Sequence, residues 1–323
     1  MAIVCRICAT PITTPPHNVT EMMYGSGEVF QYYRCQGCDC LQIGEIPDNI
    51  DKFYPTDYYS LSQDFAKKKS DGLAKKFKNL KIRSTVLGDS FLAKTLHLLA
   101  KSEPHASLTG TGLGLDSHIL DVGCGAGGRF FALKECGFNN VAGLEPNIPH
   151  ELSYDNGFKV YKSQITNFKS NHLFDLITFF SSFEHIANPL ETLQGVKMLL
   201  ALGGRCLIKI PVFPSLAWEM YKENWVQLDA PRHLFLYSIK SLEILVKKAG
   251  FAIQRVEYDS SAFQYWGSEQ YKQNITLKSE RSYGINKERS IFSKADIKRY
   301  KKLAKKSNAE KTGDQATILL KVV

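Results

Sequence analysis

Four cysteines near the start of the chain have the spacing of a metal site. Cys5 and Cys8 form one Cys-x2-Cys pair, and Cys35 and Cys38 form a second pair after 26 intervening residues. Each pair directs two thiolates at one point, and four thiolates close a tetrahedron around zinc with Zn–S distances of about 2.3 Å. We therefore expect these four cysteines to bind a structural Zn2+, because four protein ligands leave no open coordination position. Cys40 is expected to stay outside the site.

A glycine-rich turn and two acids have the spacing of a nucleoside-binding site. Residues 119–128 read ILDVGCGAGG, so a short apolar strand is followed by a glycine turn. Glu145 ends the next predicted strand, where its carboxylate can accept hydrogen bonds from both ribose hydroxyls, each contributing about 1.5–3 kcal/mol. The turn also satisfies the dinucleotide spacing GxGxxG, which is a weak signal alone. Asp121 favours a cationic ligand, because its carboxylate would repel a pyrophosphate.

These candidate residues lie at the ends of predicted strands in a strand–helix alternation. Strands are predicted at residues 118–122, 140–144, 159–161, 174–180, 205–210, 251–258 and 316–322. Helices are predicted at 129–136 and after the caps Asn188 and Ser238. This alternation predicts a parallel sheet with helices on both faces. Ligands bind such sheets beyond the carboxyl ends of the strands, where the strand order reverses.

The pattern divides the chain into three parts. We expect a zinc-binding module at residues 1–60, a helical linker or cap at 61–112 and an α/β domain at 113–323, with a helical insertion at about 260–311. The helical stretch within 64–101 is predicted from apolar residues at Leu92, Leu96 and Leu99. The stretch SLTGTGLG, residues 107–114, indicates a linker whose side chains do not suit a core.

Composition and charge exclude several classes of protein. The 323 residues are 44% hydrophobic and 23% charged, which excludes a disordered or collagen-like chain. No apolar run approaches the roughly 20 residues of a membrane span, and the N-terminus lacks a signal-peptide core, so we expect a cytoplasmic protein with zinc rather than disulfides. The net charge is +9, and residues 272–306 hold twelve Lys or Arg and three acids. That segment is either a solvated helical face or a surface for phosphates, nucleic acid or anionic membranes.

The strand-end motifs resemble a known enzyme family. ILDVGCGAGG, GLEPN, FDLITFFSSFEHIANP and LLALGGRCLIKIP follow one another along the chain and look like the successive motifs of class I methyltransferases, which use S-adenosyl-L-methionine (SAM). The resemblance implies a Rossmann-like, seven-stranded sheet whose last strand is antiparallel. It implies that the glycine turn packs on the methionine part of SAM and that Glu145 holds the ribose. Gln164 and Ile165 would flank the adenine, and Ser181 and Ser182 would lie near the sulfonium. The expected cofactor-binding residues are Asp121, Gly123, Gly125, Gly127, Glu145, Gln164, Ile165, Ser181 and Ser182.

Methyl transfer to a hydroxyl requires a base, most often histidine. His185 follows the strand 174–180 beside Glu184, at the mouth of the expected cofactor crevice, and it is the first candidate base. The alternative is that Glu184 and His185 only brace the loop. His233 is the second candidate base, in the loop WVQLDAPRHL, which could cover the site through Trp225. The alternative there is a packed lid with an ion pair between Arg232 and Asp229.

A second resemblance concerns the acceptor. The segments YYRCQGCDCLQ and FYPTDYYS are similar to the N-terminal zinc region of bacterial sugar methyltransferases, and residues 57–60 (DYYS) could supply a tyrosine to the site. DAPRHLFLYS and FQYWGSEQY look like methyltransferases encoded with surface-polysaccharide genes. We therefore predict SAM-dependent methyl transfer to a sugar hydroxyl of a nucleotide sugar or bacterial glycan, with a small molecule or glycan as the partner.

Three alternative functions stay open. Sugar C-methylation is one, although Ser182 stands where that pattern has tyrosine. RNA methylation is the second, with the zinc module and basic segment binding phosphates, but the Asn/Asp-Pro-Pro-Tyr/Phe motif of base amino-group methylation is missing after strand 174–180. A non-catalytic zinc adaptor is the third. We do not expect nucleic acid as a partner; contact with a membrane surface is left open, and no oligomeric state is predicted.

Overall fold

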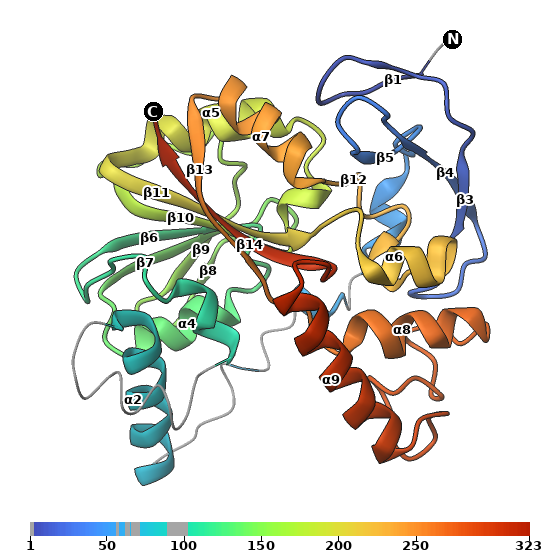
Figure 1. The fold of residues 1–323 in the computed structure, drawn as a ribbon. Coiled ribbons are helices and arrows are strands. Elements are labelled where there is room, and N and C mark those ends of the chain that lie inside the picture. Colours follow the sequence, from blue (N-terminus) through green and yellow to red (C-terminus); the bar gives the residue numbers. More distant parts are fainter. Residues whose placement is uncertain (1–2, 56–57, 62–64, 66–71, 89–102) are drawn as a thin grey trace.

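The computed structural model describes the chain except residues 1–2, 56–57, 62–64, 66–71 and 89–102 (Figure 1). An eight-stranded sheet in the order β13-β14-β11-β10-β6-β7-β9-β8 forms its centre. Its strands are β6 (His118–Val122), β7 (Asn140–Leu144), β8 (Leu152–Ser153), β9 (Lys159–Tyr161), β10 (Phe174–Phe180), β11 (Leu200–Pro211), β13 (Phe251–Tyr258) and β14 (Gln315–Val322).

Strand directions confirm the predicted α/β class. The neighbours from β9 to β11 are parallel, and β14 is antiparallel to both β11 and β13. The two-residue strand β8, antiparallel to β9, adds an edge strand to the seven that were expected. The strand order reverses at β6, because the chain continues to β7 on one side and later to β10 on the other. A ligand site is therefore expected beyond the carboxyl end of β6.

Helices cover both faces of this sheet, as Figure 1 shows. Helices α2 (Leu73–Leu87) and α4 (Gly128–Glu135) and the 3-10 helix η3 (Glu103–Leu108) lie on one face, and α5 (Pro189–Leu199) and α7 (Ile239–Lys248) lie on the other. Alternate side chains of a strand point to opposite faces, so Ile119 packs with the first group and Leu120 with the second. Helix α7 starts at a capping box between Ser238 and Ser241.

The cysteine-rich segment shares a sheet with the α/β part. Strands β1 (Ile3–Val4) and β2 (Pro11–Ile12) form a hairpin beside β3 (His17–Thr20), β4 (Val29–Arg34) and β5 (Leu41–Ile43). Strand β12 (Phe235–Leu236) pairs antiparallel with β5 and completes the order β12-β5-β4-β3. The 3-10 helices η1 (Ile50–Phe53) and η2 (Tyr59–Leu61) lead away from this sheet. The buried side chains of this segment also join one cluster with those of β10 and β11.

Shorter elements surround the junction of the two sheets. These are η4 (Phe183–His185), α6 (Leu216–Tyr221), η5 (Lys222–Asn224) and η6 (Val226–Leu228), together with α8 (Phe263–Lys272) and α9 (Lys294–Ala309) of the expected insertion. Backbone N–H groups of Leu277 and Lys278 donate to the carbonyls of Met22 and Met23, at 3.1 and 3.0 Å. The insertion is thus hydrogen-bonded to the N-terminal segment.

The stretch 61–114 differs from expectation in one respect. Within 64–101 the structure describes helix α2, while Leu92, Leu96 and Leu99 lie outside the described residues. The interpretation of residues 107–114 as a linker without core side chains is wrong, because Leu108 and Leu113 are buried in the cluster beneath α2. Nowhere in the described part of the chain is there a helix with the length and apolar composition needed to cross a bilayer.

Candidate functional site

The glycine turn lies between β6 and α4, at the point where the strand order reverses. Gly123, Gly125 and Gly127 have φ angles of +70°, +57° and +85°, which side chains rarely adopt. A Cβ on Gly123 would lie 2.4 Å from the Cβ of Ser182, and one on Gly125 would lie 2.2 Å from the carbonyl oxygen of Ser60. The turn thus needs glycine both for its backbone conformation and for the close approach of these two serines.

Glu145 contacts this turn directly. One carboxylate oxygen accepts from the N–H of Gly125 at 2.9 Å, and the other accepts from the N–H of Asn147 at 3.1 Å. The side chain is buried, and burial raises the pKa of its carboxyl above the ordinary value. Each oxygen can accept a further hydrogen bond. The glycine turn and Glu145, which were predicted at the ends of two consecutive strands, are therefore in contact. Glu145 can still accept hydrogen bonds from ribose hydroxyls.

Asp121 and Ser182 lie beneath the same turn. The Thr178 hydroxyl donates to Asp121 at 2.7 Å, and the Ser182 hydroxyl donates to the Val122 carbonyl at 2.6 Å. Burial raises the pKa of Asp121 to about 7, so a nearby cation would favour its ionised form. Ser181 is exposed, with φ +50°.

The expected adenine-flanking residues lie further along the chain, after β9. Gln164 is exposed, whereas Ile165 is buried in the core. The backbone of Ile165 approaches α5, where a Cβ on Gly195 would lie 3.7 Å from its carbonyl oxygen. The roles of both residues at a cofactor stay predictions.

Three candidate catalytic residues come together beyond β10. Glu184 and His185 belong to η4, and His233 lies in the loop before β12. One ring nitrogen of each histidine and one Glu184 oxygen lie within 4.8 Å of one another. Burial raises the pKa of Glu184 to about 8 and lowers that of His185 to about 3 and that of His233 below its ordinary value. We name this group the Glu-His-His cluster.

The histidine rings are oriented by backbone carbonyls. Nδ1 of His185 lies 2.8 Å from the carbonyl oxygen of Arg232, and Nδ1 of His233 lies 2.7 Å from that of Gln227. Because a carbonyl only accepts, Nδ1 carries the hydrogen in each neutral ring and Nε2 keeps its lone pair. The Tyr54 hydroxyl lies 3.0 Å from Nδ1 of His185.

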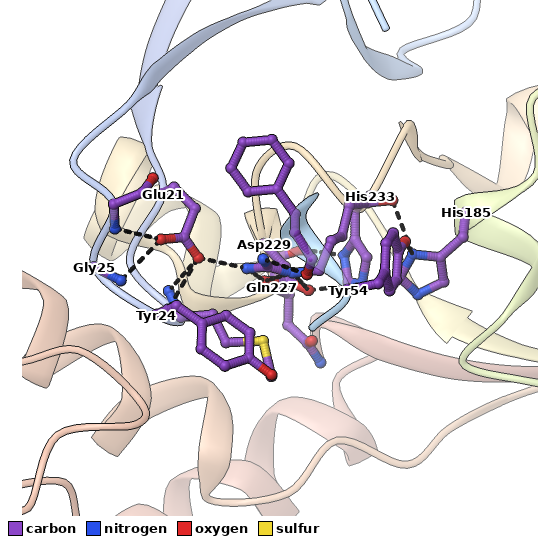
Figure 2. Close-up of polar contacts among 12 residues, drawn as sticks. Glu21, Tyr24, Gly25, Tyr54, His185, Gln227, Asp229 and His233 are labelled. Carbon is purple, nitrogen blue, oxygen red and sulfur yellow. Dashed lines mark hydrogen bonds and ion pairs between the residues drawn. The ribbon is translucent and has the colours of Figure 1, made fainter. Parts of the chain in front are cut away.

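A buried ion-pair network supports this loop, and Figure 2 shows it running from Glu21 towards His185. The fully buried Arg232 guanidinium donates three hydrogen bonds to Asp229 and one, at 2.8 Å, to Glu21. Glu21 also accepts from the N–H groups of residues 23–26. Although burial alone would raise it, the pKa of Asp229 is lowered by Arg232. The ion pair between Arg232 and Asp229, which was the alternative interpretation of this loop, is present.

Two residues of this site, Glu21 and Tyr54, were not predicted, because their partners Arg232 and His185 lie more than 130 residues away in the sequence. Tyr58, from the stretch 57–60 that was expected to supply a tyrosine, is buried and packs edge-to-face on Tyr54, with ring centroids 5.2 Å apart. The role of residues 57–60 at the site stays a prediction. Trp225 cannot present a ring face to a substrate, because it is fully buried and donates to Asp314 at 3.0 Å.

The predicted cysteines form a compact group in the N-terminal segment. The Sγ atoms of Cys5 and Cys38 are 3.6 Å apart, those of Cys8 and Cys35 are 3.5 Å apart, and all four lie within 4.8 Å of one another. A tetrahedron with Zn–S bonds of about 2.3 Å has edges of about 3.8 Å, so this spacing fits zinc. A hydrogen bond from Cys38 lowers the pKa of Cys5 to about 5. Cys40 is buried outside the group.

Comparison with known proteins identifies the family. The family model described as a methyltransferase domain matches residues 88–256, which is more than half of the chain. The chain belongs to this methyltransferase family. The order and directions of the strands agree with the sheet expected for class I methyltransferases.

Curated relatives share part of this domain. A tRNA U34 carboxymethyltransferase of Pseudomonas fluorescens (strain Pf0-1) is 26% identical over 164 residues, which cover 47% of this chain and 49% of the relative. A ubiquinone biosynthesis O-methyltransferase of Rickettsia canadensis is 40% identical over 96 residues, which cover 28% of this chain and 41% of the relative. The chain spans about half the length of the curated relatives that it matches.

The solved structures that resemble this chain include a SAM-dependent methyltransferase of Archaeoglobus fulgidus. Its TM-score is 0.39 and its sequence is 17% identical, and the match covers 64% of this chain and 85% of the solved chain. The cyclopropane synthase MmaA2 of Mycobacterium tuberculosis has a TM-score of 0.44 and 18% identity over 81% of this chain and 95% of that one.

Proposed function

We propose that this methyltransferase methylates a hydroxyl group of a sugar, in a nucleotide sugar or a bacterial glycan. The supporting observation is the Glu-His-His cluster, two of whose members, Glu184 and His185, come two and three residues after Ser182, the residue packed against the glycine turn. Polar side chains thus follow closely a residue that we expect to contact the cofactor, which supports a polar acceptor at this position. A polyhydroxylated acceptor suits such a polar, partly buried site, and methylation of carbon has less support because Ser182 replaces the tyrosine of that pattern.

The residues around the glycine turn fit SAM. Glu145 would accept hydrogen bonds from the ribose, Gly123 and Gly125 would let the backbone approach the methionine part, and Asp121 would offset positive charge. When bound, SAM supplies a methyl group on a positively charged sulfonium. The protein then has to hold the acceptor oxygen in line with that methyl, with reacting atoms about 3–3.5 Å apart.

The acceptor hydroxyl must also lose a proton. His185 is our first candidate base, because its Nδ1 is held by the Arg232 carbonyl and its Nε2 is left to accept. Burial lowers the pKa of His185, which keeps the ring neutral at physiological pH but also makes Nε2 a weaker proton acceptor than an exposed histidine. His233 is the second candidate, because its Nδ1 is likewise held by a backbone carbonyl.

We further propose that the four clustered cysteines bind structural Zn2+. Zinc at this position would stabilise the loop between β1 and β2 and the loop between β4 and β5. It would thereby also stabilise the segment that carries Glu21 and Tyr54. The metal would therefore support the active site without touching the substrate. The geometry that supports this proposal is the spacing of the four Sγ atoms.

RNA methylation is the second candidate function. The outward face of α9 carries exposed Lys298, Lys301, Lys302, Lys305 and Lys306, and several curated relatives are named as tRNA-modifying enzymes. A basic helix face binds phosphates without reading sequence. It would bring RNA to the protein but would not choose the atom that is methylated.

Calorimetry and an acceptor panel test these proposals. We expect SAM to bind the purified protein, and we expect methyl transfer to nucleotide sugars or oligosaccharides and not to tRNA. Mass spectrometry of co-purified small molecules would narrow the choice of sugar. Methylation of tRNA, with affinity that falls steeply as salt is raised, would favour the second function. Absence of SAM binding would refute both and favour a non-catalytic zinc adaptor.

A further inference from the structure

The Glu184 carboxylate has no protein partner despite complete burial. Neither of its oxygens makes a hydrogen bond within the described part of the chain, and its side chain has no exposed surface. Nε2 of His233 lies 3.8 Å from Oε1 of Glu184, which is too far for a hydrogen bond. A carboxylate left in such an environment costs several kcal/mol unless a charged or hydrogen-bonding group compensates it.

The two histidines present their free nitrogens in the manner of metal ligands. In each ring Nδ1 donates to a backbone carbonyl, at 2.8 Å for His185 and 2.7 Å for His233. Histidines that ligate metals typically donate their other N–H to a carbonyl or carboxylate, which fixes the ring and its tautomer. Both rings are therefore neutral with Nε2 unprotonated, which is the state in which a histidine nitrogen can bind a metal.

The three side chains converge. Their candidate ligand atoms lie within 4.8 Å of one another, and the two ring centroids are 4.7 Å apart. Two imidazoles and one carboxylate form the ligand set of catalytic zinc sites, which keep a further position open, and of non-haem ferrous sites. This set differs from the four thiolates of the N-terminal segment in both chemistry and coordination.

The charges of the surrounding network also favour a cation. Asp229 and Glu21 bring two carboxylates to the one guanidinium of Arg232. Glu184 adds a third, unpaired carboxyl group, which burial keeps mostly protonated while no cation is bound. All four side chains are mostly or fully buried, so solvent screens them little. With both histidines neutral, a divalent cation at the Glu-His-His cluster would favour the ionised form of Glu184, with release of its proton, and would balance the negative charge of the cluster and its neighbours.

We propose that Glu184, His185 and His233 bind one divalent transition-metal ion of the zinc class, in addition to the ion at the four cysteines. Binding of the metal ion does not depend on the proposed sugar methylation. A role of the ion in orienting the acceptor hydroxyl would rest on that proposed function. The two roles of His185, proton acceptor and metal ligand, exclude each other at Nε2, so metal content decides between them.

Metal analysis with zinc as the probe tests the proposal. The protein would be equilibrated with excess Zn2+, freed of unbound metal and analysed by plasma mass spectrometry. We expect the native chain to hold one zinc ion more per chain than the Glu184→Gln and His233→Gln variants, whose side chains nearly preserve volume. The Tyr54→Phe variant is the matched control, because it removes a hydroxyl beside His185 and leaves all three ligands; it should retain the native zinc content.

A crystal structure of the zinc-loaded native protein is the second readout and does not depend on a variant folding. Anomalous scattering at the zinc edge should show a peak among the three side chains as well as one among the cysteines. Equal zinc content in the native and Glu184→Gln proteins, or an anomalous peak at the cysteines alone, would overturn the proposal. Failure of the proposed function would appear separately, as absent SAM binding or absent sugar methylation with the zinc content unchanged.

Discussion

The buried Arg232 guanidinium is the residue whose loss we expect to destabilise the protein most. Its side chain has no exposed surface and donates to Asp229, to Glu21 and, at 3.3 Å, to the Phe53 carbonyl. Substitution Arg232→Met keeps much of the aliphatic volume but leaves two largely buried carboxylates without their cation. Removing one partner of a buried ion pair typically costs about 3–5 kcal/mol, because the remaining charge is uncompensated. We expect a loss of this size in the free energy of unfolding.

The assay is denaturant unfolding in the presence of zinc, followed by tryptophan fluorescence. Buried Trp225 lies in the same loop as Asp229 and reports on its environment. The control is Arg289→Met, whose ion pair with Glu280 is mostly exposed, at 64% and 79% of the side-chain surface. Exposed pairs contribute about 0–1 kcal/mol. If Arg232→Met lowers the free energy of unfolding by no more than this control, the interpretation of the network as a buried structural link is wrong.

The double variant Glu21→Gln/Arg232→Met refines the measurement. Since both residues belong to one network, their separate effects should not add, and the coupling energy should lie between about 0.5 and 3 kcal/mol. Additive effects would show that the N-terminal segment and the histidine loop are stabilised independently. The same variants should also lower methyl transfer, because losing the Arg232 side-chain contacts would loosen the loop whose backbone carbonyl at residue 232 orients His185.

Three further predictions concern the cofactor, pH and zinc. Glu145→Gln should weaken SAM binding by roughly 10-fold to 100-fold, the equivalent of about 1.5–3 kcal/mol for a charge-assisted hydrogen bond; unchanged affinity in calorimetry would exclude its ribose role. The pKa of Asp121 in the folded protein is raised to about 7, so the free energy of unfolding of the native protein should fall as pH rises from about 4 to 7. Relative to the native protein, the Asp121→Asn variant should gain at most about 3 kcal/mol in the free energy of unfolding between pH 5 and pH 8. A difference between the two proteins that does not change with pH would contradict this. Cys38→Ser should lose the structural zinc and Cys40→Ser should keep it, as measured by metal content; equal content in both would place the metal elsewhere.

Several features of the fold followed from local patterns. The apolar run 174–180 forms the largely buried strand β10, as a nearly continuous apolar run indicates. Helix α5 begins at Asn188-Pro189, since a cap followed by proline at the first helical position marks a helix start. Errors arose where local composition misleads. Glycine and threonine at 107–114 resembled a linker, yet Leu108, at the end of η3, and Leu113, beyond it, are both buried in the core cluster that includes residues of α2. Aromatic Trp225 resembled a substrate platform, yet packing buries it.

The amino-acid sequence by itself determined the cysteine pairs, the glycine turn and the acid at the end of the next strand, since each depends on short spacing and on the adjacency of consecutive parallel strands. Only the tertiary structure decided which groups surround the histidines. Tyr54 reaches His185 across 131 residues, and Glu21 reaches Arg232 across 211. Such contacts arise because β12 joins the sheet of the cysteine-rich segment, and no local pattern encodes a pairing between segments so distant along the chain.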